Sequence, residues 1–523
     1  MAGPATARWM IAAPRRSCGK TMIAVGLAAA LRRRGVSVQT FKKGPDYIDP
    51  SWLALASGRP CRNLDPYLSP QREIDACFAR HADAAQAVLV EANMGLHDAM
   101  AEDGADSSAT LAARLDLRVI LVVDARGMTR SVAPLVLGMQ RFDPDVAFAG
   151  VVLNHCTGAR HEARLRAAIA RHTTLPVIGA IGHHDGLGVD ERHLGLVPGN
   201  EQHEAARVVD RLADVVERGI DVAALAAPAC AVRPGAVRLA EVRLAEVRAA
   251  SQTESQAGFR TALQPVVQPR CRTREPLRIG IARDRAFGFY YADDLDAFAV
   301  AGAQLVPFDT LADPALPPVD ALFIGGGFPE RHLDALAANR SLREALRERL
   351  ADGMPAYAEC GGLMYLCRAI EAGGRRHEMV GAIPADATML PRPVGRGYVH
   401  LAPAADTSGW WCAVAGDRGC GPAGGPAGND TAAPVVRAHE FHHSTLVDVA
   451  PGLRYGWRVR RGHGIDGARD GIVVGNLFAS YAHLRSGTGA GTCWPAAFVA
   501  FARQRTDPHQ TGAGHGHVAA LHG

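Results

Sequence analysis

The apolar and polar positions form two blocks along the chain. Each block alternates short strand-like runs with helical patterns, as an α/β fold does. Between Trp9 and about Leu225, short β-rich apolar runs are separated by longer stretches with helical periodicity. The first run, "WMIAA", precedes the amphipathic stretch "MIAVGLAAALRRRG", and five further runs follow it: "VSVQTFK", "QAVLVEA", "RVILVVDA", "AFAGVVLN" and "PVIGAI". This order predicts βαβ units built around a mostly parallel sheet.

A second block with the same alternation lies nearer the C-terminus. It begins at "PLRIGIARD" and continues through "ALFIGGGFPE", "MPAYAECGGLMYL" and "VVGNLFASYAH". Because each block alternates strand and helix patterns over a length that can bury its own core, we expect two α/β domains. The first would span residues 8–226 and the second residues 276–506.

Three stretches lack this alternation. Residues 227–275 contain the imperfect duplication "VRLAEVRLAEVR" and then Gln, Ser and Thr with few large apolar side chains, a composition typical of a linker. Residues 403–434 are rich in Gly, Ala and Pro, which predicts an insertion loop in the second domain. The tail, residues 507–523, is expected to be disordered, and its loosely spaced histidines do not indicate a metal site.

The composition and charge of the chain limit the classes of protein to which it can belong. The 523-residue chain has a net charge of +4 and no arginine cluster interleaved with aromatic residues, so we expect no nucleic-acid partner. Its first residues lack the layout of a signal peptide, and no window approaches about 18 uninterrupted apolar residues. We therefore expect no membrane contact and a cytoplasmic location. The 11 cysteines have no CxxC spacing, which indicates reduced thiols rather than a disulfide framework or a zinc site.

The stretch "APRRSCGKTM", residues 13–22, lies between the first apolar run and the first helical pattern. Gly19 lets backbone N–H groups face phosphate oxygens, Lys20 can meet the outer phosphates, and the Thr21 hydroxyl can ligate Mg²⁺. A short GKT tripeptide also occurs by accident, and Pro14 stands where a Walker A motif has glycine. The order of strand, loop and helix nevertheless favours a nucleotide site.

Carboxylates gather in the same domain. Asp46 and Asp49 follow an apolar run in "KKGPDYIDP", and Asp65 lies in "RNLDP". Glu91 ends another run in "LVEANMGLHD", and Asp98 comes later in the same motif. In open α/β sheets, ligands bind at this carboxyl end of the strands. Each acid alone could cap a helix or form a turn, and that interpretation is preferred for Asp65 taken singly. The cluster behind a GKT loop predicts phosphoryl transfer with Mg²⁺.

The second domain carries the residues of thiol chemistry. In "YAECGGLMYL", Cys360 follows an apolar strand and precedes a helix across a Gly-Gly turn, a geometry that exposes a thiol at a helix N-terminus. The glycines of "IGGGFPE", residues 324–330, could supply backbone N–H groups for an oxyanion hole. His483 in "FASYAHL" is the candidate base, and "HEFHHS", residues 439–444, competes for that role. A buried, inert cysteine is the alternative.

Taken together, these motifs resemble one family. The chain is similar to cobyrinic or hydrogenobyrinic acid a,c-diamide synthases, the glutamine-dependent corrinoid amidotransferases of cobalamin biosynthesis. The resemblance covers both domains, from about residue 9 to residue 500. It rests on the following motifs in the family's order: "FKKGPDYIDP", "RNLDP", "MGLHD", "ERHLGL", "FGFYY", "GGGFPE", "YAECGGLMYL", "HEFHHS" and "FASYAHL".

The resemblance implies a fold and a reaction. The N-terminal domain would be a P-loop, dethiobiotin-synthetase-like domain with a parallel sheet, which uses ATP and Mg²⁺ to phosphorylate a side-chain carboxylate of the corrinoid. The C-terminal domain would be a class I glutamine amidotransferase domain, which releases ammonia from L-glutamine. Ammonia would then displace phosphate and form the amide first on the c and then on the a side chain. A homodimer is the assembly considered.

In the N-terminal domain, the resemblance assigns side chains to three ligands. The ATP contacts would come from Gly19, Lys20, Thr21, Lys42 and Asn154, the last of which would read adenine. The magnesium ligands would be Thr21, Asp65 and Glu91. The corrinoid carboxylates would be handled by Asp46, Tyr47, Asp49 and Asp98.

In the C-terminal domain, Cys360 would be the nucleophile and His483 its base. The oxyanion site would be lined by Gly326, Gly327 and Gly361. "HEFHHS" mimics the HExxH zinc motif, but it lies among short β-like stretches, so metal binding is not expected there. Its residues His439 and His442 would instead face the corrinoid or the domain interface.

Several positions depart from the family pattern. The phosphate loop is usually closer to "APASGSGKTT", so residues 15–18 are unusual, and Ser17 would strain the loop if positive φ is required there. "EANMGLHDA" stands where "EGVMGLYDG" is usual, which alters the floor of the expected acceptor site. Asp294 replaces an asparagine. Arg485 stands where class I glutaminases have a glutamate, so the sequence does not identify the group that orients His483.

Three other functions compete. Cobyric acid synthases share the two-domain plan and amidate four other corrinoid side chains, but their phosphate loop and "GPDYIDP" region differ. A partition-type P-loop ATPase with a degenerate glutaminase domain would hydrolyse ATP without glutamine. A decayed synthase is the third alternative. Retention of the reactive groups in both domains favours an active a,c-diamide synthase, a carbon–nitrogen ligase with glutamine as nitrogen donor.

Overall fold

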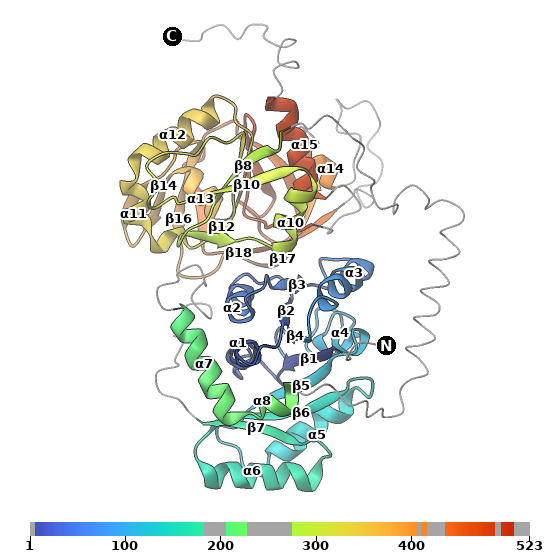
Figure 1. Ribbon diagram of the computed structural model, residues 1–523. Helices are drawn as coiled ribbons and strands as arrows, with labels where there is room; N and C mark the ends of the chain where they lie inside the picture. Colours follow the sequence, from blue (N-terminus) through green and yellow to red (C-terminus); the bar gives the residue numbers. More distant parts are fainter. Residues whose placement is uncertain are drawn as a thin grey trace, which may run out of the picture.

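The computed structural model describes residues 6–182, 205–226, 275–405, 409–415, 435–486 and 493–506. The expected tail, most of the expected linker and insertion, and the "ERHLGL" motif lie outside these residues. The described residues form two α/β bodies, one from the N-terminal half of the chain and one from the C-terminal half (Figure 1). Among the described helices, none is long and apolar enough to cross a membrane.

A seven-stranded sheet, with strand order β3-β2-β4-β1-β5-β6-β7, organises the N-terminal domain. All of its neighbouring strands are parallel, which confirms the predicted parallel sheet. Its strands are β1 (Ala7–Ala12), β2 (Val38–Lys43), β3 (Arg62–Leu64), β4 (Ala87–Glu91), β5 (Arg118–Asp124), β6 (Phe148–Cys156) and β7 (Val177–Gly182). Its helices are α1 (Lys20–Arg33), α2 (Ile48–Ser57), α3 (Gln71–Ala82), α4 (Ser108–Arg114), α5 (Val132–Phe142), α6 (Ala159–His172), α7 (Ala205–Gly219) and α8 (Val222–Ala226).

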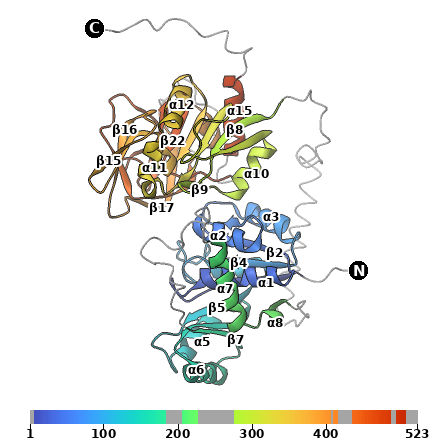
Figure 2. The same cartoon turned by 60° about the vertical axis from the view of Figure 1, so that its left-hand side comes forward.

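Helices cover both faces of this sheet because its strands are apolar on both sides. In β1, Trp9 and Ile11 point into a core shared with α1, α2 and α7, whereas Met10 and Ala12 point into a core shared with α3, α4, α5 and α6. Fully buried strands of this kind are typical of parallel sheets. Edge strand β3 lies on the side of this sheet nearest the C-terminal domain, and β7 lies on the far side (Figures 1 and 2).

A nine-stranded mixed sheet organises the C-terminal domain, with strand order β10-β8-β11-β13-β22-β21-β20-β17-β18. The strands from β10 to β22 in this order are parallel, and the remaining strands are antiparallel. They are β8 (Leu277–Ala282), β10 (Ala303–Phe308), β11 (Ala321–Ile324), β13 (Ala356–Glu359), β17 (Gly395–Pro403), β18 (Val436–His442), β20 (Arg454–Arg461), β21 (Arg469–Val474) and β22 (Leu477–Ser480).

Two smaller sheets and a set of helices complete this domain. The small sheets comprise β9 (Phe287–Phe289), β12 (Gly326–Gly327), β14 (Cys367–Ala372), β15 (Arg375–Glu378), β16 (Ile383–Met389) and β19 (Ser444–Val447). The helices are α10 (Ala292–Val300), η1 (Pro329–Arg331), α11 (Leu333–Ala338), α12 (Arg340–Ala351), α13 (Gly361–Leu366), α14 (Trp410–Val414) and α15 (Trp494–Thr506). Helix α14 lies within the expected insertion, yet Trp410 and Trp411 are buried in the core, so this part of the segment is not a surface loop.

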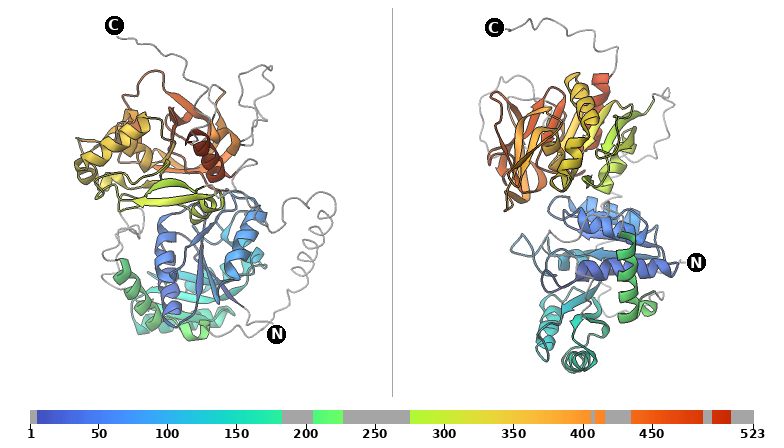
Figure 3. Two further views of the ribbon diagram at one scale, coloured as in Figure 1. Left: turned by 45° about the horizontal axis from the view of Figure 1, so that its top comes forward. Right: turned by 90° about the vertical axis from the view of Figure 1, so that its left-hand side faces the viewer.

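The two domains meet (Figure 3) at β3, the edge strand of the N-terminal sheet, and at the segments that follow β2 and β3. Arg62, in β3, pairs with Asp293 of α10 at 2.9 Å and with Asp296 at 2.7 Å. Arg485 donates a hydrogen bond across the interface to the backbone oxygen of Asn63. These contacts place β3 directly against the C-terminal domain.

Candidate active sites

The phosphate loop of the N-terminal domain joins β1 to α1 and is held by a side chain from β6. Gly19 has a φ of 91°, and a Cβ there would come within 2.3 Å of the Asn154 amide nitrogen. That amide donates a hydrogen bond to the backbone oxygen of Cys18 at 3.0 Å. Asn154 therefore supports the loop in this structure, and its expected contact with adenine stays a prediction.

Ser17 adopts the conformation that the sequence analysis identified as costly. Its φ is 57°, in the left-handed region where a side chain crowds the backbone. The positive φ on which the expected strain depends is therefore present. Arg15 is 65% exposed and pairs with Asp124, at the end of β5, at 3.1 Å, while the Lys20 ammonium donates to the Arg15 backbone oxygen at 3.3 Å.

Replacing Ser17 with glycine should stabilise the N-terminal domain by about 1 kcal/mol, because glycine adopts a positive φ without a steric penalty. The Ser17 side chain is exposed, so little packing is lost. Thermal unfolding should shift upward by roughly 2–4 °C for a domain of this size. Ser17→Ala is the control, since it removes the hydroxyl but keeps the Cβ. An equal gain from alanine would contradict the explanation by φ.

Beside this loop, Lys42 holds together three carboxylates from two segments: Asp46 and Asp49, which follow β2, and Glu91, which ends β4. Its ammonium lies 2.5 Å from Asp49, 3.1 Å from Glu91 and 4.0 Å from Asp46. The Thr21 hydroxyl donates to the same Glu91 oxygen at 2.6 Å. Five of the predicted site residues thus come together at the carboxyl ends of β2 and β4.

Burial changes the protonation of these acids. It raises the pKa of Glu91 to about 7, and the charge of Asp49 adds to the effect. Burial and Asp49 likewise raise the pKa of Asp46 to about 7. Burial, followed by the neighbouring Lys42, lowers the pKa of Lys20. Such shifts are common where groups are poised to bind charged ligands.

The cluster fits a magnesium ion. Glu91 Oε2 is buried and has no hydrogen-bond partner among the described residues, and its other oxygen is shared with Thr21 and Lys42. Carboxylate and hydroxyl oxygens are the ligands that Mg²⁺ prefers. Of the three expected magnesium ligands, Thr21 and Glu91 are adjacent.

Asp65, the third expected magnesium ligand, makes other contacts. Its carboxylate accepts backbone hydrogen bonds from Tyr67 and Leu68 and a hydrogen bond from the Tyr398 hydroxyl of the C-terminal domain at 3.1 Å. Asp98 is exposed and accepts a hydrogen bond from the Gly95 backbone at 2.8 Å. Neither carboxylate contacts the group around Lys42, so their expected roles stay predictions.

In the C-terminal domain, Cys360 lies between β13 and α13 in a strained turn. Its φ of 49° and ψ of −104° are unusual for a residue other than glycine. Its backbone N–H donates to Ser480 in β22 at 2.8 Å, and its thiol lies 3.6 Å from the backbone oxygen of Phe441. The strand, turn and helix place Cys360 before α13 as the sequence predicted, but the residue is buried, at 7% exposure, rather than exposed. Its function as a nucleophile stays a prediction.

His483 is positioned beside Cys360 by a residue that sequence reasoning missed. Glu359, the residue before the nucleophile, has Oε2 3.3 Å from His483 Nδ1. Its other oxygen accepts hydrogen bonds from the Tyr357 hydroxyl at 2.6 Å and the Leu484 backbone at 2.9 Å. Burial opposes protonation of His483, but hydrogen bonds to Cys360 and then Glu359 raise its pKa to about 10. The residues form a Cys-His-Glu triad.

A signal for Glu359 was present in the sequence. It is the only charged residue in the apolar run "MPAYAE", and it directly precedes the candidate nucleophile. A carboxylate in a fully buried strand needs a partner, which can be a histidine. The pairing of Glu359 with His483 could not be predicted from the sequence, because it depends on β13 lying beside β22.

Replacing Glu359 with glutamine should lower the turnover number for glutamine hydrolysis by roughly 100-fold, because the amide no longer stabilises the imidazolium. The pKa of His483 should fall, so the pH profile of glutamine hydrolysis should shift. Initial rates of glutamate release across pH measure both effects. Glu348→Gln, at an exposed position on α12, is the control. A reduced rate with an unchanged pH profile would indicate a structural role only.

The three predicted oxyanion glycines surround the triad. A Cβ at Gly326 would lie 2.6 Å from His483 Cε1, and a Cβ at Gly361 would lie 3.2 Å from the Gly327 nitrogen. Larger residues would therefore close the space beside Cys360. Their function as an oxyanion hole stays a prediction.

Comparison with known proteins finds matches to both domains. Two protein-family models match the chain: the CobQ/CobB/MinD/ParA nucleotide binding domain over residues 9–196, and the CobB/CobQ-like glutamine amidotransferase domain over residues 278–489. The chain is 42% identical over 477 residues to the cobyrinate a,c-diamide synthase of Magnetococcus marinus, covering 91% of this chain and 93% of that one. The chain belongs to the cobyrinate a,c-diamide synthase family.

Other members of the cobyrinate a,c-diamide synthase family match over similar lengths. The synthase of Syntrophotalea carbinolica is 39% identical and covers 95% of this chain and 98% of its own. The synthase of Methanosarcina acetivorans is 38% identical, and the match covers 91% of this chain and 92% of that one. The predicted arrangement, a nucleotide-binding domain followed by a glutamine amidotransferase domain, is confirmed.

In this member of the family, Tyr47 connects the two sites. It follows Asp46 after β2, and its ring stacks on Phe289 with centroids 5.2 Å apart. The centre of the same ring lies 4.4 Å from that of Tyr291 and 5.1 Å from that of His483. Tyr47 was expected to bind the corrinoid, and the structure places it between that expected site and the triad.

The two histidines of "HEFHHS" have different surroundings. His439 pairs with His483 through both backbone groups, and burial lowers its pKa to about 3. His442 is buried, stacks on Tyr481 with centroids 3.8 Å apart, and lies 2.8 Å from the Ser444 backbone oxygen. His439 thus reaches the interface side of the triad, whereas His442 packs within its own domain.

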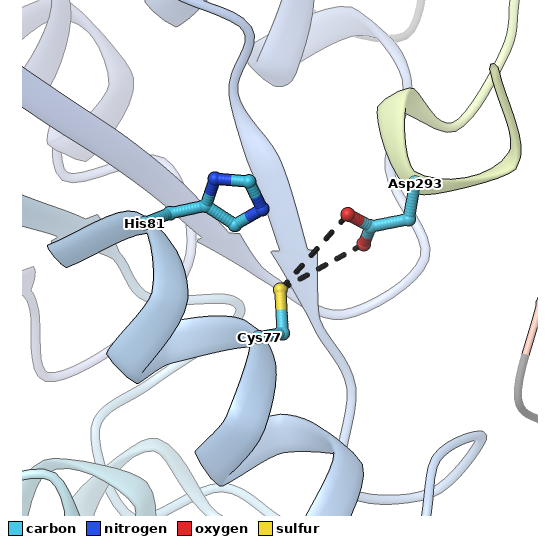
Figure 4. Close-up of side chains that lie close together, drawn as sticks. All are labelled: Cys77, His81 and Asp293. Atoms are coloured by element: carbon cyan, nitrogen blue, oxygen red, sulfur yellow. Dashed lines mark hydrogen bonds between the residues drawn. The ribbon is translucent and has the colours of Figure 1, made fainter. Parts of the chain in front are cut away.

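One group of potential metal ligands occurs elsewhere in the described part of the chain. Cys77 and His81 of α3 lie close to Asp293 of the other domain (Figure 4). Arg62 pairs with that carboxylate at 2.9 Å, and Arg485 lies 3.6 Å from it. Two guanidinium groups oppose the binding of a cation, so this group is best described as an interdomain contact.

Proposed function

We propose that the protein catalyses ATP- and glutamine-dependent amidation of the a and c side-chain carboxylates of cobyrinic or hydrogenobyrinic acid. The observation that carries this proposal is the position of Tyr47, whose ring lies against the glutaminase histidine while its loop supplies Asp46 and Asp49 to the ATP domain. Ammonia formation and carboxylate activation would then occur on opposite sides of the Tyr47 side chain.

In the glutaminase site, His483 would accept the Cys360 proton, and the thiolate would attack the side-chain carbonyl carbon of glutamine. Backbone N–H groups near Gly326, Gly327 and Gly361 would stabilise the oxyanion. His483 would return the proton to the departing nitrogen, which releases ammonia and leaves a thioester. Water would then hydrolyse the thioester to glutamate and regenerate Cys360.

In the ATP domain, a corrinoid carboxylate oxygen would attack the γ-phosphorus of ATP and release ADP. The carboxylate is a poor electrophile until phosphorylation makes its oxygen a leaving group. Lys20 and Lys42 would neutralise charge on the phosphates, and Asn154 would hold the loop beneath them. Mg²⁺ bound by Thr21 and Glu91 would supply further charge neutralisation. Ammonia would attack the acyl phosphate, and phosphate would depart.

Product mass tests the proposal. The protein is incubated with ATP, Mg²⁺, glutamine and either corrinoid acid, and the product should have exchanged one and then two hydroxyl groups for amino groups. Omission of ATP should prevent the exchange. A synthase of the cobyric acid type would instead amidate a supplied a,c-diamide further. Hydrolysis of ATP with no amide under any of these conditions would favour the P-loop ATPase alternative.

The proposed partners are the corrinoid, ATP and L-glutamine, with no nucleic acid and no membrane. The proposed location is the cytoplasm, where such small, charged substrates are dissolved. A homodimer stays the proposed assembly, and size-exclusion chromatography with light scattering tests it.

A further inference from the structure

The antiparallel end of the C-terminal sheet presents basic side chains toward the N-terminal domain. In the register of this sheet, His400 of β17 lies opposite Arg437 of β18 on one side and opposite Arg461 of β20 on the other. Directly opposed residues of neighbouring strands project from the same face. Three basic groups therefore form one row across three strands.

A second row lies beside the first and leads toward the glutaminase triad. Two residues before His400, Tyr398 lies opposite His439, and the adjacent Val399 points into the core. The backbone of His439 in turn pairs with His483. The face thus changes from basic at its outer end to aromatic near the catalytic histidine. We call these five residues, Tyr398, His400, Arg437, His439 and Arg461, the interface strip.

Tyr67 of the N-terminal domain packs against the interface strip. Its ring stacks on Tyr398 with centroids 4.2 Å apart, and its hydroxyl lies 2.8 Å from His400 Nε2. The guanidinium carbons of Arg437 and Arg461 lie 5.3 and 5.7 Å from the Tyr67 ring centre. Tyr67 follows β3, whose carboxyl end neighbours that of β2, so the strip lies across from the loops that hold the expected acceptor site.

The basic row has unbalanced positive charge. Arg437 donates to the Tyr67 backbone oxygen at 3.1 Å, and Arg461 donates to the Tyr67 hydroxyl at 2.7 Å. Within the described part of the chain, neither guanidinium pairs with a carboxylate, and both residues are exposed. Burial, followed by Arg461 and Arg437, lowers the pKa of His400. A guanidinium binds carboxylates through two parallel hydrogen bonds, so this row suits a ligand with several carboxylates.

We propose that the interface strip is the second wall of the corrinoid site, in which Arg437 and Arg461 bind substrate carboxylates that are not being amidated. This inference rests on the proposed function. The substrate has a flat, largely apolar macrocycle with carboxylates around its rim. His439 and the stacked rings of Tyr67 and Tyr398 offer aromatic surface to the macrocycle, and the arginines meet the rim. The corrinoid would then touch both domains at once.

Steady-state kinetics of the full-length protein test the strip. Arg437→Ala and Arg461→Ala should each raise the KM for the corrinoid by roughly 10- to 100-fold, the range expected for loss of a charged hydrogen bond. The KM values for ATP and glutamine should change by less than about twofold. Arg340→Ala is the matched control, because Arg340 is an exposed arginine of the same domain that pairs with Glu344.

Salt dependence separates substrate binding from a purely structural role. Added NaCl should raise the wild-type KM for the corrinoid, and each arginine variant should show a smaller rise because one screened charge is missing. An unchanged KM, or a salt dependence equal to that of the wild type, would overturn the proposal even if the wild type forms the diamide. If the wild type forms no diamide, the proposed function fails, and absorbance titration of the corrinoid against these variants still tests the strip.

Discussion

Replacing Cys360 with alanine should lower kcat/KM for glutamine-dependent amidation by at least about 1,000-fold while leaving ammonia-dependent amidation in place. The reason is the separation of the two chemistries. Cys360 is the only thiol described beside His483. In the proposed mechanism it acts only in the release of nitrogen from glutamine. Supplied ammonia bypasses that step and reaches the activated carboxylate directly. Glutamate release and product mass, measured with each nitrogen source, give the two rates.

Cys367→Ala is the matched control for this variant. Cys367 lies just beyond the same helix, where its buried thiol contacts the Leu363 backbone oxygen at 3.4 Å, and burial raises its pKa. Cys367→Ala should still use both glutamine and ammonia as nitrogen sources. Residual glutamine use by Cys360→Ala would refute the triad. Loss of ammonia-dependent synthesis in a folded Cys360→Ala protein would refute the separation of the sites.

Replacing Glu91 with glutamine should have the complementary effect and lower amidation roughly 1,000-fold with either nitrogen source. The Glu91 carboxylate accepts from Thr21, pairs with Lys42 and has one buried oxygen without a partner among the described residues. The neutral amide would leave the Lys42 charge less compensated and remove a carboxylate ligand from the expected magnesium site. ADP formation and product mass with ammonium chloride measure the loss.

Glutamine hydrolysis without corrinoid should persist in Glu91→Gln, because Glu91 makes no described contact with the triad. Glu102→Gln, at an exposed position in the loop after β4, is the control for the charge change. Wild-type ammonia-dependent synthesis by Glu91→Gln would show that the cluster around Lys42 is not the site of phosphoryl transfer. Simultaneous loss of both reactions with lowered thermal stability would show a folding defect instead.

The parallel sheets could be predicted because their strands are short, apolar runs separated by helical patterns. In β1, for example, all residues from Trp9 to Ala12 are buried, so the strand stands out from its surroundings. The order β3-β2-β4-β1 could not be predicted, because it depends on which crossovers pack together. The antiparallel strands β17 to β21 were less visible, since β18 alternates core residues with Arg437, His439 and Phe441.

The site residues also divide into those that the sequence could predict and those that it could not. Gly19, Lys20, Thr21 and Cys360 could be found because each lies in a local motif whose geometry follows from a few neighbouring residues. Contacts made over long separations could not be found. The Asp65 carboxylate meets the Tyr398 hydroxyl 333 residues later, and its local sequence gives no sign of this partner. The interdomain contacts of Asp65 and Tyr47 required the relative placement of the two domains.

The ring of Tyr47 has a consequence for how this protein can change over evolutionary time. Because its ring centre lies 5.1 Å from that of His483 and its segment carries Asp46 and Asp49, the proposed function makes two reactions depend on its size. A substitution that suits a different acceptor molecule also alters the surroundings of the glutaminase histidine. Divergence toward a new substrate at this position therefore requires compensating changes around Phe289 and Tyr291, in the other half of the chain.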